Sequence, residues 1–551
     1  MTPSSTCMNG PEGRLVSGDA LLEGVGAQGW YQRRLLWLFV LPVCFFLPVV
    51  CLNVLMQVTA PDHWCHVPGR PDSVSLDQWR QRTLPRRRLP GGSATHSRCL
   101  MFSAALTNAT DDWRNTTYDA GATPAASSNQ TAGVTACQFG WEFDRNDFSE
   151  TAVSAFQWVC DQSQESTRLL TTSSVGNLLG SIVFGWLADR LGRRLVFFLL
   201  AVLQPLVSVA GVLAAQPTVF IVMRFFAALC YPVMYQLVFT IGMEFTGVSR
   251  RTCYAVVVSM AFTLGMCALP LVAYLLNDWV HLGLASALPT LLFLPCFWLV
   301  DESPRWLLSR GRLTDATAVL RRVAVANGVP PGTMEGLLET TSGTSCQPAS
   351  PSLLQLLSGR RLRLKTAVIT ACWAINVIMY YGLMLSFSDM SGNLFLNFFL
   401  LSVVELPSNV LALYVCDRLG RRPTQLLFFT GSGLSLMAVI PLQYVSGTGG
   451  AITALLMLGK FCTSLTFVVL YLQSAELYPT CVRSMAIGLS SLVGIGAGIF
   501  TPYILRLAIL SPSYPFIVMG GLGGVGALCV AQLPETRSRP LPETLEDAER
   551  D

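Results

Sequence analysis

Four ionisable residues lie inside long apolar runs of this sequence, away from the ends of the runs: Arg224, Glu405, Lys460 and Arg506. A charged side chain is costly inside a bilayer, so each of them is a candidate for contact with a polar or ionic ligand. A carboxylate attracts cations, and an ammonium or guanidinium attracts anions. A buried pair of opposite charges can also be purely structural.

Glu405 lies about 12 residues, or about 18 Å of helix, into its apolar run, which is near the middle of a bilayer. Three interpretations of Glu405 stay open: a carboxylate that attracts a cationic ligand, a structural partner of Lys460 or Arg224, and a proton carrier. We expect Arg224 to be mainly structural and Arg506 to reach the outer surface of the membrane.

Lys460 and Arg224 occupy related places in an internal repeat but differ in depth. Lys460 lies sixteen positions before Glu476, whereas Arg224 lies twenty positions before Glu244. The difference is about one helical turn, so we expect Lys460 to lie deeper. This depth favours contact with a ligand, although an ion pair with an acidic neighbour explains a buried lysine equally well.

Aromatic side chains supply a second kind of contact for an organic ion, through cation–π attraction of about 0.5–2 kcal/mol each. Tyr235 and Phe239 are four positions apart and share a helix face, and Phe467 follows Tyr235 at an offset of 232. Tyr380 and Tyr381 are adjacent in another apolar run. Packing within a helix bundle is the commoner role of a single aromatic residue, but for the symmetric pair Tyr235 and Phe467 we favour a cavity.

The sequence repeats three landmarks, in the same order, at offsets of 228, 232 and 233. An Asp-Arg-Leu-Gly-Arg-Arg element occurs at 189–194 and at 417–422. The charged residues of the two copies are Asp189, Arg193, Glu244 and Arg251, and Asp417, Arg421, Glu476 and Arg483. Exposed ion pairs contribute about 0–1 kcal/mol each, which suits a gate that must open. We expect these pairs to hold the cytoplasmic ends of two structural halves together and to release them.

The composition indicates a membrane protein. Hydrophobic residues make up 52% of the 551 residues and charged residues 13%, against about 25% charged in soluble domains, and the mean hydropathy is +0.49. The net charge of +4 is small and argues against a nucleic-acid partner. The sequence has no P-loop, zinc motif or nucleophile elbow, and its four histidines lack metal-ligand spacing. We therefore expect no enzyme activity, metal or cofactor.

Twelve apolar segments are long enough to cross a bilayer as helices. They lie near 35–58, 169–188, 195–214, 218–241, 253–276, 280–300, 366–387, 393–415, 424–445, 450–474, 485–508 and 514–533. With the repeat they predict an all-α membrane protein of two pseudo-symmetric six-helix bundles. The predicted divisions are an N-terminus (1–34), helix 1 (35–58), a large loop (59–168), helices 2–6 (169–300), a linker (301–365), helices 7–12 (366–533) and a tail (534–551). Glycine-rich stretches at 488–498 and 520–524 would let helices approach closely or bend.

Lysine and arginine in the short connections predict the orientation. The links after helices 2, 4, 6, 8 and 10 hold eighteen such residues and those after helices 3, 5, 7, 9 and 11 hold none, so both termini are predicted to be cytoplasmic. The 59–168 loop is then extracellular, and it carries three glycosylation acceptors, Asn108, Asn115 and Asn129. Its four cysteines, Cys65, Cys99, Cys137 and Cys160, permit two disulfides in three possible pairings.

The chain resembles the major facilitator superfamily and, within it, the organic cation, zwitterion and organic anion transporter family. The resemblance covers nearly the whole chain. It is carried by the cysteine-bearing loop, Trp141-Glu-Phe-Asp144, the Asp301-Glu-Ser-Pro-Arg-Trp306 element, Ala475-Glu-Leu-Tyr-Pro-Thr-Cys-Val-Arg483 and the tail. It implies the major facilitator fold, a Glu405 that faces a central cavity and a cavity position for Tyr380. It also implies that Lys460 matches a lysine of anion and zwitterion carriers.

Two positions depart from the family's pattern. Ile495 stands in helix 11 where cation carriers tend to have an acidic residue and anion or zwitterion carriers an arginine. Asn376 stands in helix 7 where some cation carriers have aspartate. The charge of the solute therefore stays open, since Glu405 favours a cation or zwitterion and Lys460 disfavours a bare cation.

The resulting prediction is a secondary active or facilitative transporter of small organic ions that works by alternating access in the plasma membrane. Organic cations or zwitterions of the carnitine type are the preferred solutes, and coupling to a co-transported or exchanged ion is left open. Two alternatives stay open: an organic anion exchanger, and a non-transporting receptor of the same fold. The oligomeric state is not predicted.

Overall fold

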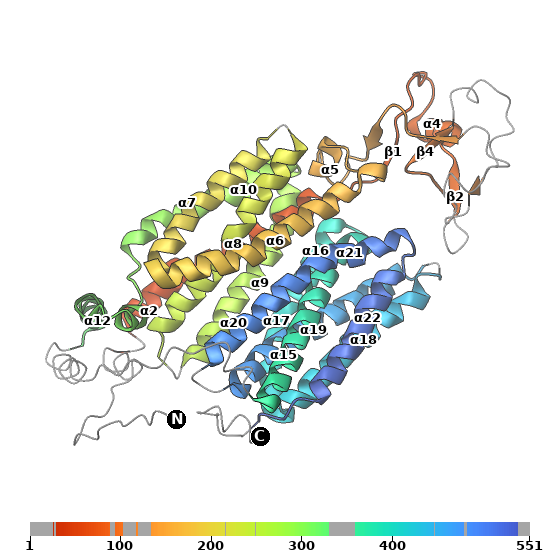
Figure 1. Ribbon diagram of the computed structural model, residues 1–551. Coiled ribbons are helices and arrows are strands. Elements are labelled where there is room, and N and C mark those ends of the chain that lie inside the picture. The colour runs from red at the N-terminus through yellow and green to blue at the C-terminus, as the bar shows by residue number, and fades with distance from the viewer. Residues whose placement is uncertain are drawn as a thin grey trace, which may run out of the picture.

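The computed structural model is almost entirely helical, with a small strand-bearing segment at one end (Figure 1). The structure describes residues 26, 29–88, 94–102, 117–118, 134–214, 216–247, 250–329, 359–445, 447–478 and 482–537. The three expected glycosylation acceptors, Asn108, Asn115 and Asn129, lie outside the described residues. Most of the predicted N-terminus and most of the predicted tail lie outside them as well.

Six helical stretches of the described chain form the N-terminal half, drawn from red to green in Figure 1. They are α2, η1 and α3 (Trp30–Leu35, Leu36–Val40 and Leu41–Gln57), α6 (Gln164–Leu191), α7 (Arg193–Val212), α8 (Pro217–Phe245), α9 (Arg251–Leu276), and α10 with η5 (Trp279–Ala287 and Leu288–Trp298). Their apolar residues pack against one another because the longer helices are rich in Leu, Val, Phe and Ala.

Six further described stretches form the C-terminal half, drawn from green to blue. They are α15 with η6 (Arg360–Leu385 and Ser386–Asp389), α16 with α17 (Leu394–Val403 and Glu405–Leu419), α18 (Arg421–Leu442), α19 (Gly449–Leu477), α20 to η8 (Arg483–Ala497, Gly498–Phe500, Thr501–Arg506 and Leu507–Ile509), and α22 (Tyr514–Ala531). The two halves therefore repeat the same number of helical stretches in the same order.

Eleven helices in the described part of the chain are long and apolar enough to cross a membrane. The twelfth expected span corresponds to α6, which has 28 residues but carries more polar side chains than the others. α6 packs along α8 and also lies against α20 and α21 of the other half. Its place in the N-terminal bundle is the one expected for helix 2.

Helix 8 runs over Leu394–Leu419 as one membrane-length helix, as expected over 393–415, with a one-residue irregularity at Val404. α16 ends at Val403 and α17 begins at Glu405. Pro407 lacks the backbone N–H that would continue the hydrogen-bond ladder and its ring crowds the preceding turn. The irregularity at Val404, which keeps helical backbone angles, lies directly before Glu405.

The described part of the segment between α3 and α6 contains short strands and two disulfides. Its elements are β1 (His63–Cys65), α4 (Leu76–Thr83), β2 (Arg86–Arg88), β3 (Ala94–His96), β4 (Leu100–Phe102), β5 (Thr117–Tyr118), β6 (Val134–Ala136), β7 (Trp141–Phe143), α5 (Ala152–Ala155) and η3 (Cys160–Gln162). β1 pairs antiparallel with β7, β4 pairs with β6, and β2 lies between β3 and β5. The disulfides are Cys65–Cys137 and Cys99–Cys160, one of the three pairings that the sequence left open.

The linker between the halves begins with two short helices, α11 (Pro304–Ser309) and α12 (Leu313–Asn327). They lie at the end of the molecule opposite the strand-bearing segment (Figure 1). The loops that carry the two Asp-Arg-Leu-Gly-Arg-Arg elements lie at this same end, because α6 and α17 run away from the strand-bearing segment. We call it the arginine-rich end.

The two halves touch mainly near the strand-bearing segment. α9 lies beside α16 and α17, and the rings of Tyr274 and Phe395 are 5.5 Å apart between centroids. α6 lies against α20, η7 and α21, where Leu178 would contact a side chain placed at Gly496.

Candidate functional site

The structure pairs the two buried charges Glu405 and Lys460. Lys460 Nζ of α19 lies 2.7 Å from Glu405 Oε1 at the start of α17, and the side chains of Lys460 and Glu405 are 0% and 7% exposed. The contact joins opposite charges at hydrogen-bond distance. Among the interpretations left open, the structure shows an ion pair with Lys460 and not with Arg224.

Lys460 also contacts an aromatic face. Its Nζ lies 3.1 Å from the ring centroid of Tyr380 on α15, a distance at which the negative face of the ring attracts a cation. The Tyr380 ring is 5.8 Å from Phe467 and 5.5 Å from Tyr381, centroid to centroid. Five predicted site residues from α15, α17 and α19 therefore converge, and we call Glu405, Lys460, Tyr380, Tyr381 and Phe467 the ion-pair cluster.

Two further aromatic residues extend this cluster and were not among the predicted site residues. Trp373 lies 5.5 Å from Phe467 and 4.5 Å from Tyr471 between ring centroids, and its Nε1 donates to Ser474 Oγ at 3.2 Å. The sequence contained a signal for Tyr471, because it follows Phe239 at the same offset that separates Phe467 from its repeat counterpart.

Tyr235 and Phe239 make their ring contacts inside the N-terminal half. Their rings stack at 6.3 Å, and Tyr235 meets Phe262 of α9 edge-on at 5.2 Å. Phe239 is 5.9 Å from Tyr254, also on α9. The ring contacts of Tyr235 are therefore with its own half, whereas Phe467 belongs to the ion-pair cluster. That the two residues share a cavity stays a prediction.

A cavity of about 160 Å³ lies between the two halves. From the N-terminal half it is lined by α3, α6, α7 and α8, including Asn177, Gln204 and Arg224. From the C-terminal half it is lined by α15, α20, η7 and α21, including Tyr381 and Ile495. Tyr381 therefore joins this cavity to the ion-pair cluster, and Ile495 presents an apolar side chain to it.

At the arginine-rich end, an acidic residue holds the start of α7. Glu302 accepts hydrogen bonds from the backbone N–H groups of Arg193 and Arg194, both at 3.1 Å. Gly192 precedes the helix with φ +110°, a conformation that favours glycine. The Arg193 guanidinium reaches back to Glu244 of α8, with Nη1 and Oε2 2.7 Å apart.

The C-terminal half repeats this arrangement. Glu535 accepts from the backbone N–H groups of Arg421 at 2.9 Å and Arg422 at 3.0 Å, after Gly420 with φ +97°. Arg421 Nη2 lies 2.7 Å from Glu476 Oε1. Burial alone would raise the pKa of the Glu535 carboxyl, but the backbone donors at the start of α18 and just after Glu535 outweigh it and hold this pKa below its ordinary value.

These ion pairs lie within each half, whereas the sequence led us to expect pairs between the halves. Asp189 participates through its backbone oxygen, which accepts from Trp306 Nε1 at 2.8 Å. Asp417 Oδ1 is 3.8 Å from Arg421 Nη1, and Arg483 Nε donates to the backbone oxygen of Tyr478 at 3.1 Å. Arg251 begins α9. In this conformation these contacts stabilise the ends of the individual bundles, because the partners are neighbouring segments of the same half.

The charged set expected from the sequence did not include Glu302 and Glu535. Their similar distances after the two glycine–arginine elements, 109 residues from Arg193 to Glu302 and 114 from Arg421 to Glu535, were the available signal, because a carboxylate at a helix start satisfies backbone donors that the helix itself leaves free.

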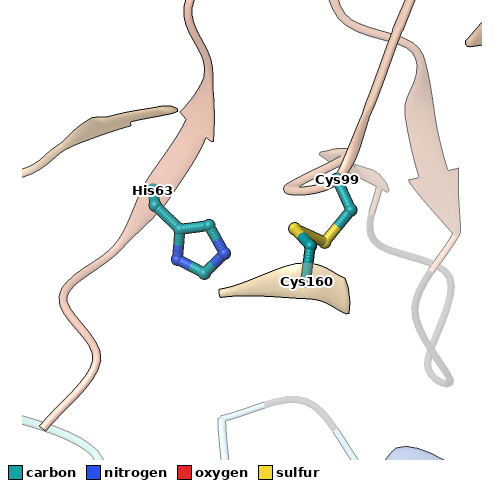
Figure 2. A group of neighbouring side chains, drawn as sticks. All are labelled: His63, Cys99 and Cys160. Carbon is teal, nitrogen blue, oxygen red and sulfur yellow. A yellow bond between two sulfur atoms is a disulfide. The ribbon is translucent and has the colours of Figure 1, made fainter. Parts of the chain in front are cut away.

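His63 lies beside the Cys99–Cys160 disulfide (Figure 2). Histidine and thiolate groups at this spacing could hold a metal ion, but the two sulfur atoms are bonded to each other here. A metal needs cysteine as thiolate, so this group is not a metal site while the disulfide is intact.

Comparison with known proteins identifies the family. The model of the family "Sugar (and other) transporter" matches residues 101–547. The human "Organic cation/carnitine transporter 2" is 31% identical over 540 residues, which is 96% of this chain and 93% of that protein. "Solute carrier family 22 member 7" of Sus scrofa is 34% identical over 542 residues, 97% of this chain and 96% of that protein. The chain belongs to the major facilitator superfamily.

Within the superfamily, these relatives place the chain with the organic cation, zwitterion and anion carriers, as the resemblance in the sequence predicted. It is a membrane transporter and not an enzyme, since the relatives are all transporters. A structure of the xylose transporter XylE from E. coli in a partially occluded inward-open conformation has a TM-score of 0.55 and 17% identity. The match covers 69% of this chain and 90% of the XylE chain, and it shows that the two proteins share a fold.

Proposed function

We propose that this transporter is a secondary active or facilitative carrier of small organic ions and that zwitterions of the carnitine type are its preferred solutes. It moves them across the plasma membrane by alternating access. The fold of two six-helix halves with a cavity between them supports this proposal. The name of the human relative joins organic cations with carnitine, a zwitterion.

The observation that carries the solute class is the neutral Glu405–Lys460 pair beneath Tyr380. A bare cation that reaches Glu405 must displace the Lys460 ammonium and leave it buried without a counter-charge, which is costly. A zwitterion has no net charge, so it can bind beside the intact ion pair without leaving Lys460 or Glu405 uncompensated. The aromatic faces of Tyr380 and Phe467 then suit a substituted ammonium group.

Organic anion exchange is the second candidate, and Arg224 favours it. Lys460 and Arg224 are positively charged and Glu405 is negatively charged, so the buried groups near the cavity carry one net positive charge. A bare cation would increase this charge, whereas an anion would neutralise it. A non-transporting receptor is not favoured, because the relatives are transporters.

The proposed orientation places both termini in the cytoplasm and the disulfide-bonded segment outside the cell. Two disulfides in that segment support it, because disulfides persist on the oxidising side of the plasma membrane. Glycosylation of Asn108, Asn115 and Asn129 belongs to the same proposal. Epitope tags at the two termini should become accessible to antibody only after the cells are permeabilised, and tags accessible on intact cells would contradict this orientation.

Uptake into proteoliposomes tests the function. Purified full-length protein is reconstituted and offered labelled γ-butyrobetaine (a zwitterion), tetraethylammonium (a cation) and para-aminohippurate (an anion) at several membrane potentials. We expect γ-butyrobetaine to be taken up fastest. Absence of uptake of all three would reject the proposal, and uptake of the anion alone would replace it with anion exchange.

Two variants test the site in the same assay. Glu405→Gln and Lys460→Gln should each reduce γ-butyrobetaine uptake by roughly tenfold, because each removes one charged contact worth about 1.5–3 kcal/mol. Tyr414→Phe is the matched control, since Tyr414 lies on the same helix but is 58% exposed on the outer face. Unchanged uptake in both glutamine variants would show that the pair does not serve the solute.

A further inference from the structure

Arg224 is a buried cation that lacks a counter-charge. Arg224 is 8% exposed. Among the described residues, no carboxylate lies within ion-pair distance of its guanidinium. Its hydrogen-bond partners are two amides of α3: Asn53 Oδ1 at 3.0 Å and Gln57 Oε1. By contrast, Lys460, Arg193 and Arg421 each have a carboxylate at 2.7 Å.

The amides that hold Arg224 are themselves fixed. Gln57 Nε2 donates to the backbone oxygen of Trp279 at 2.9 Å, and Asn53 Nδ2 donates to Ser286 Oγ. These bonds use the NH₂ groups, so both amide oxygens must face the guanidinium. The arginine is therefore held in place before any ligand arrives.

Part of the guanidinium remains available. Both hydrogen bonds to the amides leave from Nη2, and within the described part of the chain Nη1 and Nε have no acceptor. A guanidinium binds a carboxylate best through two parallel N–H donors. Arg224 also lines the cavity between the halves, so this edge has space in front of it for an anionic group.

Other polar atoms of the cavity wall also await a partner. Asn177 Oδ1, Gln204 Oε1 and Thr501 Oγ1 are buried and have no hydrogen-bond partner among the described residues, and all three residues line this cavity. Buried polar atoms are normally paired, so unpaired atoms on a cavity wall indicate a ligand or ordered water. The Thr501 hydroxyl can donate, and either amide can turn to present its NH₂ group to an anion.

The cavity favours a negative ligand by its charge. Among the described residues that line it, Arg224 is the only charged one, and the wall opposite contributes the apolar Ile495. A guanidinium surrounded by neutral groups in an apolar setting is poorly compensated. An incoming carboxylate would supply the missing charge, and because Thr501 belongs to α21, such a ligand would bridge the two halves.

We propose that Arg224 binds the carboxylate of the transported solute, with Asn177, Gln204 and Thr501 completing the subsite. The proposal deepens the proposed function and rests on it. Tyr381, which lines this cavity and packs on Tyr380, places the other end of the solute beside the ion-pair cluster. The carrier thus binds the two charged groups of a zwitterion at two separate places.

The test compares γ-butyrobetaine with its ethyl ester, which keeps the ammonium and lacks the carboxylate. Uptake into proteoliposomes and binding to the purified full-length protein are measured for both probes. Arg224→Gln should reduce uptake and binding of γ-butyrobetaine by roughly tenfold or more, the loss expected for one charged hydrogen-bonded contact. Uptake and binding of the ester should change by less than about twofold, because the ester has no carboxylate for the guanidinium to bind. Arg506→Gln, an arginine outside the cavity, is the matched control.

A second variant leaves Arg224 intact in case its replacement prevents folding. Ile495→Glu adds a carboxylate to the same cavity wall, which should compete for Arg224 and reduce γ-butyrobetaine uptake while the ester is retained. Arg224→Gln combined with Ile495→Arg should recover part of the preference for γ-butyrobetaine. Equal losses for both probes in the single variants would overturn the proposal.

The two proposals fail in distinguishable ways. Binding of γ-butyrobetaine that needs Arg224 without any uptake would reject the transport function and keep the subsite. Uptake that does not depend on Arg224 would reject the subsite and keep the function. Repeating the assay with gluconate in place of chloride separates a solute carboxylate from an inorganic anion, because an Arg224 effect that vanishes without chloride would assign the site to chloride and overturn the proposal.

Discussion

At the scale of single residues, two buried cations of similar chemistry differ in whether a carboxylate compensates their charge. Lys460 is paired with Glu405 and covered by Tyr380, so its charge is compensated without a ligand. Arg224 has two amides and a cavity instead. We therefore expect Lys460 and Glu405 to act as a unit, and Arg224 to respond to the anionic group of the solute.

Because Glu405 and Lys460 form an ion pair, we expect substitutions at the two positions to have non-additive effects on the stability of the protein. Glu405→Gln or Lys460→Gln alone leaves a buried charge without a partner, and breaking such a pair costs about 3–5 kcal/mol. The double variant leaves no charge and should recover most of this loss. Thermal unfolding of the purified protein in detergent measures the three variants against the unchanged chain, and simple addition of the two single effects would contradict the ion pair.

At the scale of helices and their ends, a carboxylate holds the first turn of α7 and another holds that of α18. Glu302 and Glu535 each accept two backbone N–H groups. Carboxylates at a helix start satisfy free donors and compensate the helix dipole. Each half therefore carries its own stabilising contact at the arginine-rich end.

Glu535→Gln should destabilise the protein by about 1 kcal/mol near pH 7, the usual contribution of such a contact. The native pKa of Glu535 lies below its ordinary value, which is about 4.3 when unfolded. The carboxylate therefore stabilises the fold above that pH and loses this effect as the pH falls through the lowered native pKa.

Thermal unfolding between pH 7 and about pH 2.5 checks this dependence. The difference between the unchanged chain and Glu535→Gln should be largest near neutral pH and should shrink in acid. Glu165→Gln on α6, which removes an exposed pair with Arg168, is the control and should show little effect at any pH. A difference that stays constant with pH would exclude the carboxylate as its cause.

Glycine sets the distance between α18 and α22. A Cβ at Gly523 would lie 2.8 Å from Gly433 Cα and 3.1 Å from the backbone oxygen of Phe429, and backbone atoms cannot move aside cheaply. Gly523→Ala should therefore destabilise the fold by about 1–3 kcal/mol. Gly524→Ala is the matched control, because nothing lies within 4 Å of a Cβ at that position. Equal effects of the two substitutions on thermal unfolding would show that the close approach is unimportant.

At the scale of the whole molecule, the two halves meet near the strand-bearing segment, where Tyr274 of α9 packs on Phe395 of α16. The Arg193–Glu244 and Arg421–Glu476 ion pairs at the opposite end each lie within one half. Alternating access would require the contacts between the halves to open in one part of the cycle. The meeting of α9 and α16 is therefore a place where movement can be tested.

Joining the halves at this contact should stop transport. Tyr274→Cys with Phe395→Cys, linked by a short bis-methanethiosulfonate reagent, should abolish γ-butyrobetaine uptake into proteoliposomes, and a reductant should restore it. Each single cysteine variant treated with the same reagent is a control and should remain active. Full uptake by the linked protein would show that this contact does not need to open.

Several features of the fold could be predicted from the sequence because their causes are local. Apolar length predicts which segments form membrane helices, and α8 and α19 lie close to the expected 218–241 and 450–474. The irregularity at Val404 was not predicted, although Pro407 is visible in the sequence. The repeat predicted the equivalent charged elements at the arginine-rich end but did not predict which residues would pair.

The amino-acid sequence by itself determined the membrane class, the two-fold repeat and the superfamily, because hydropathy and spacing are properties of the chain. Only the tertiary structure decided that Glu405 pairs with Lys460, that Arg224 faces a cavity with neutral partners, and that Cys65 bonds to Cys137. Such partners are far apart in sequence, and the distance between their side chains depends on how the helices and strands pack. Charge compensation is therefore a property of the packed molecule, even though every charge is visible in the sequence.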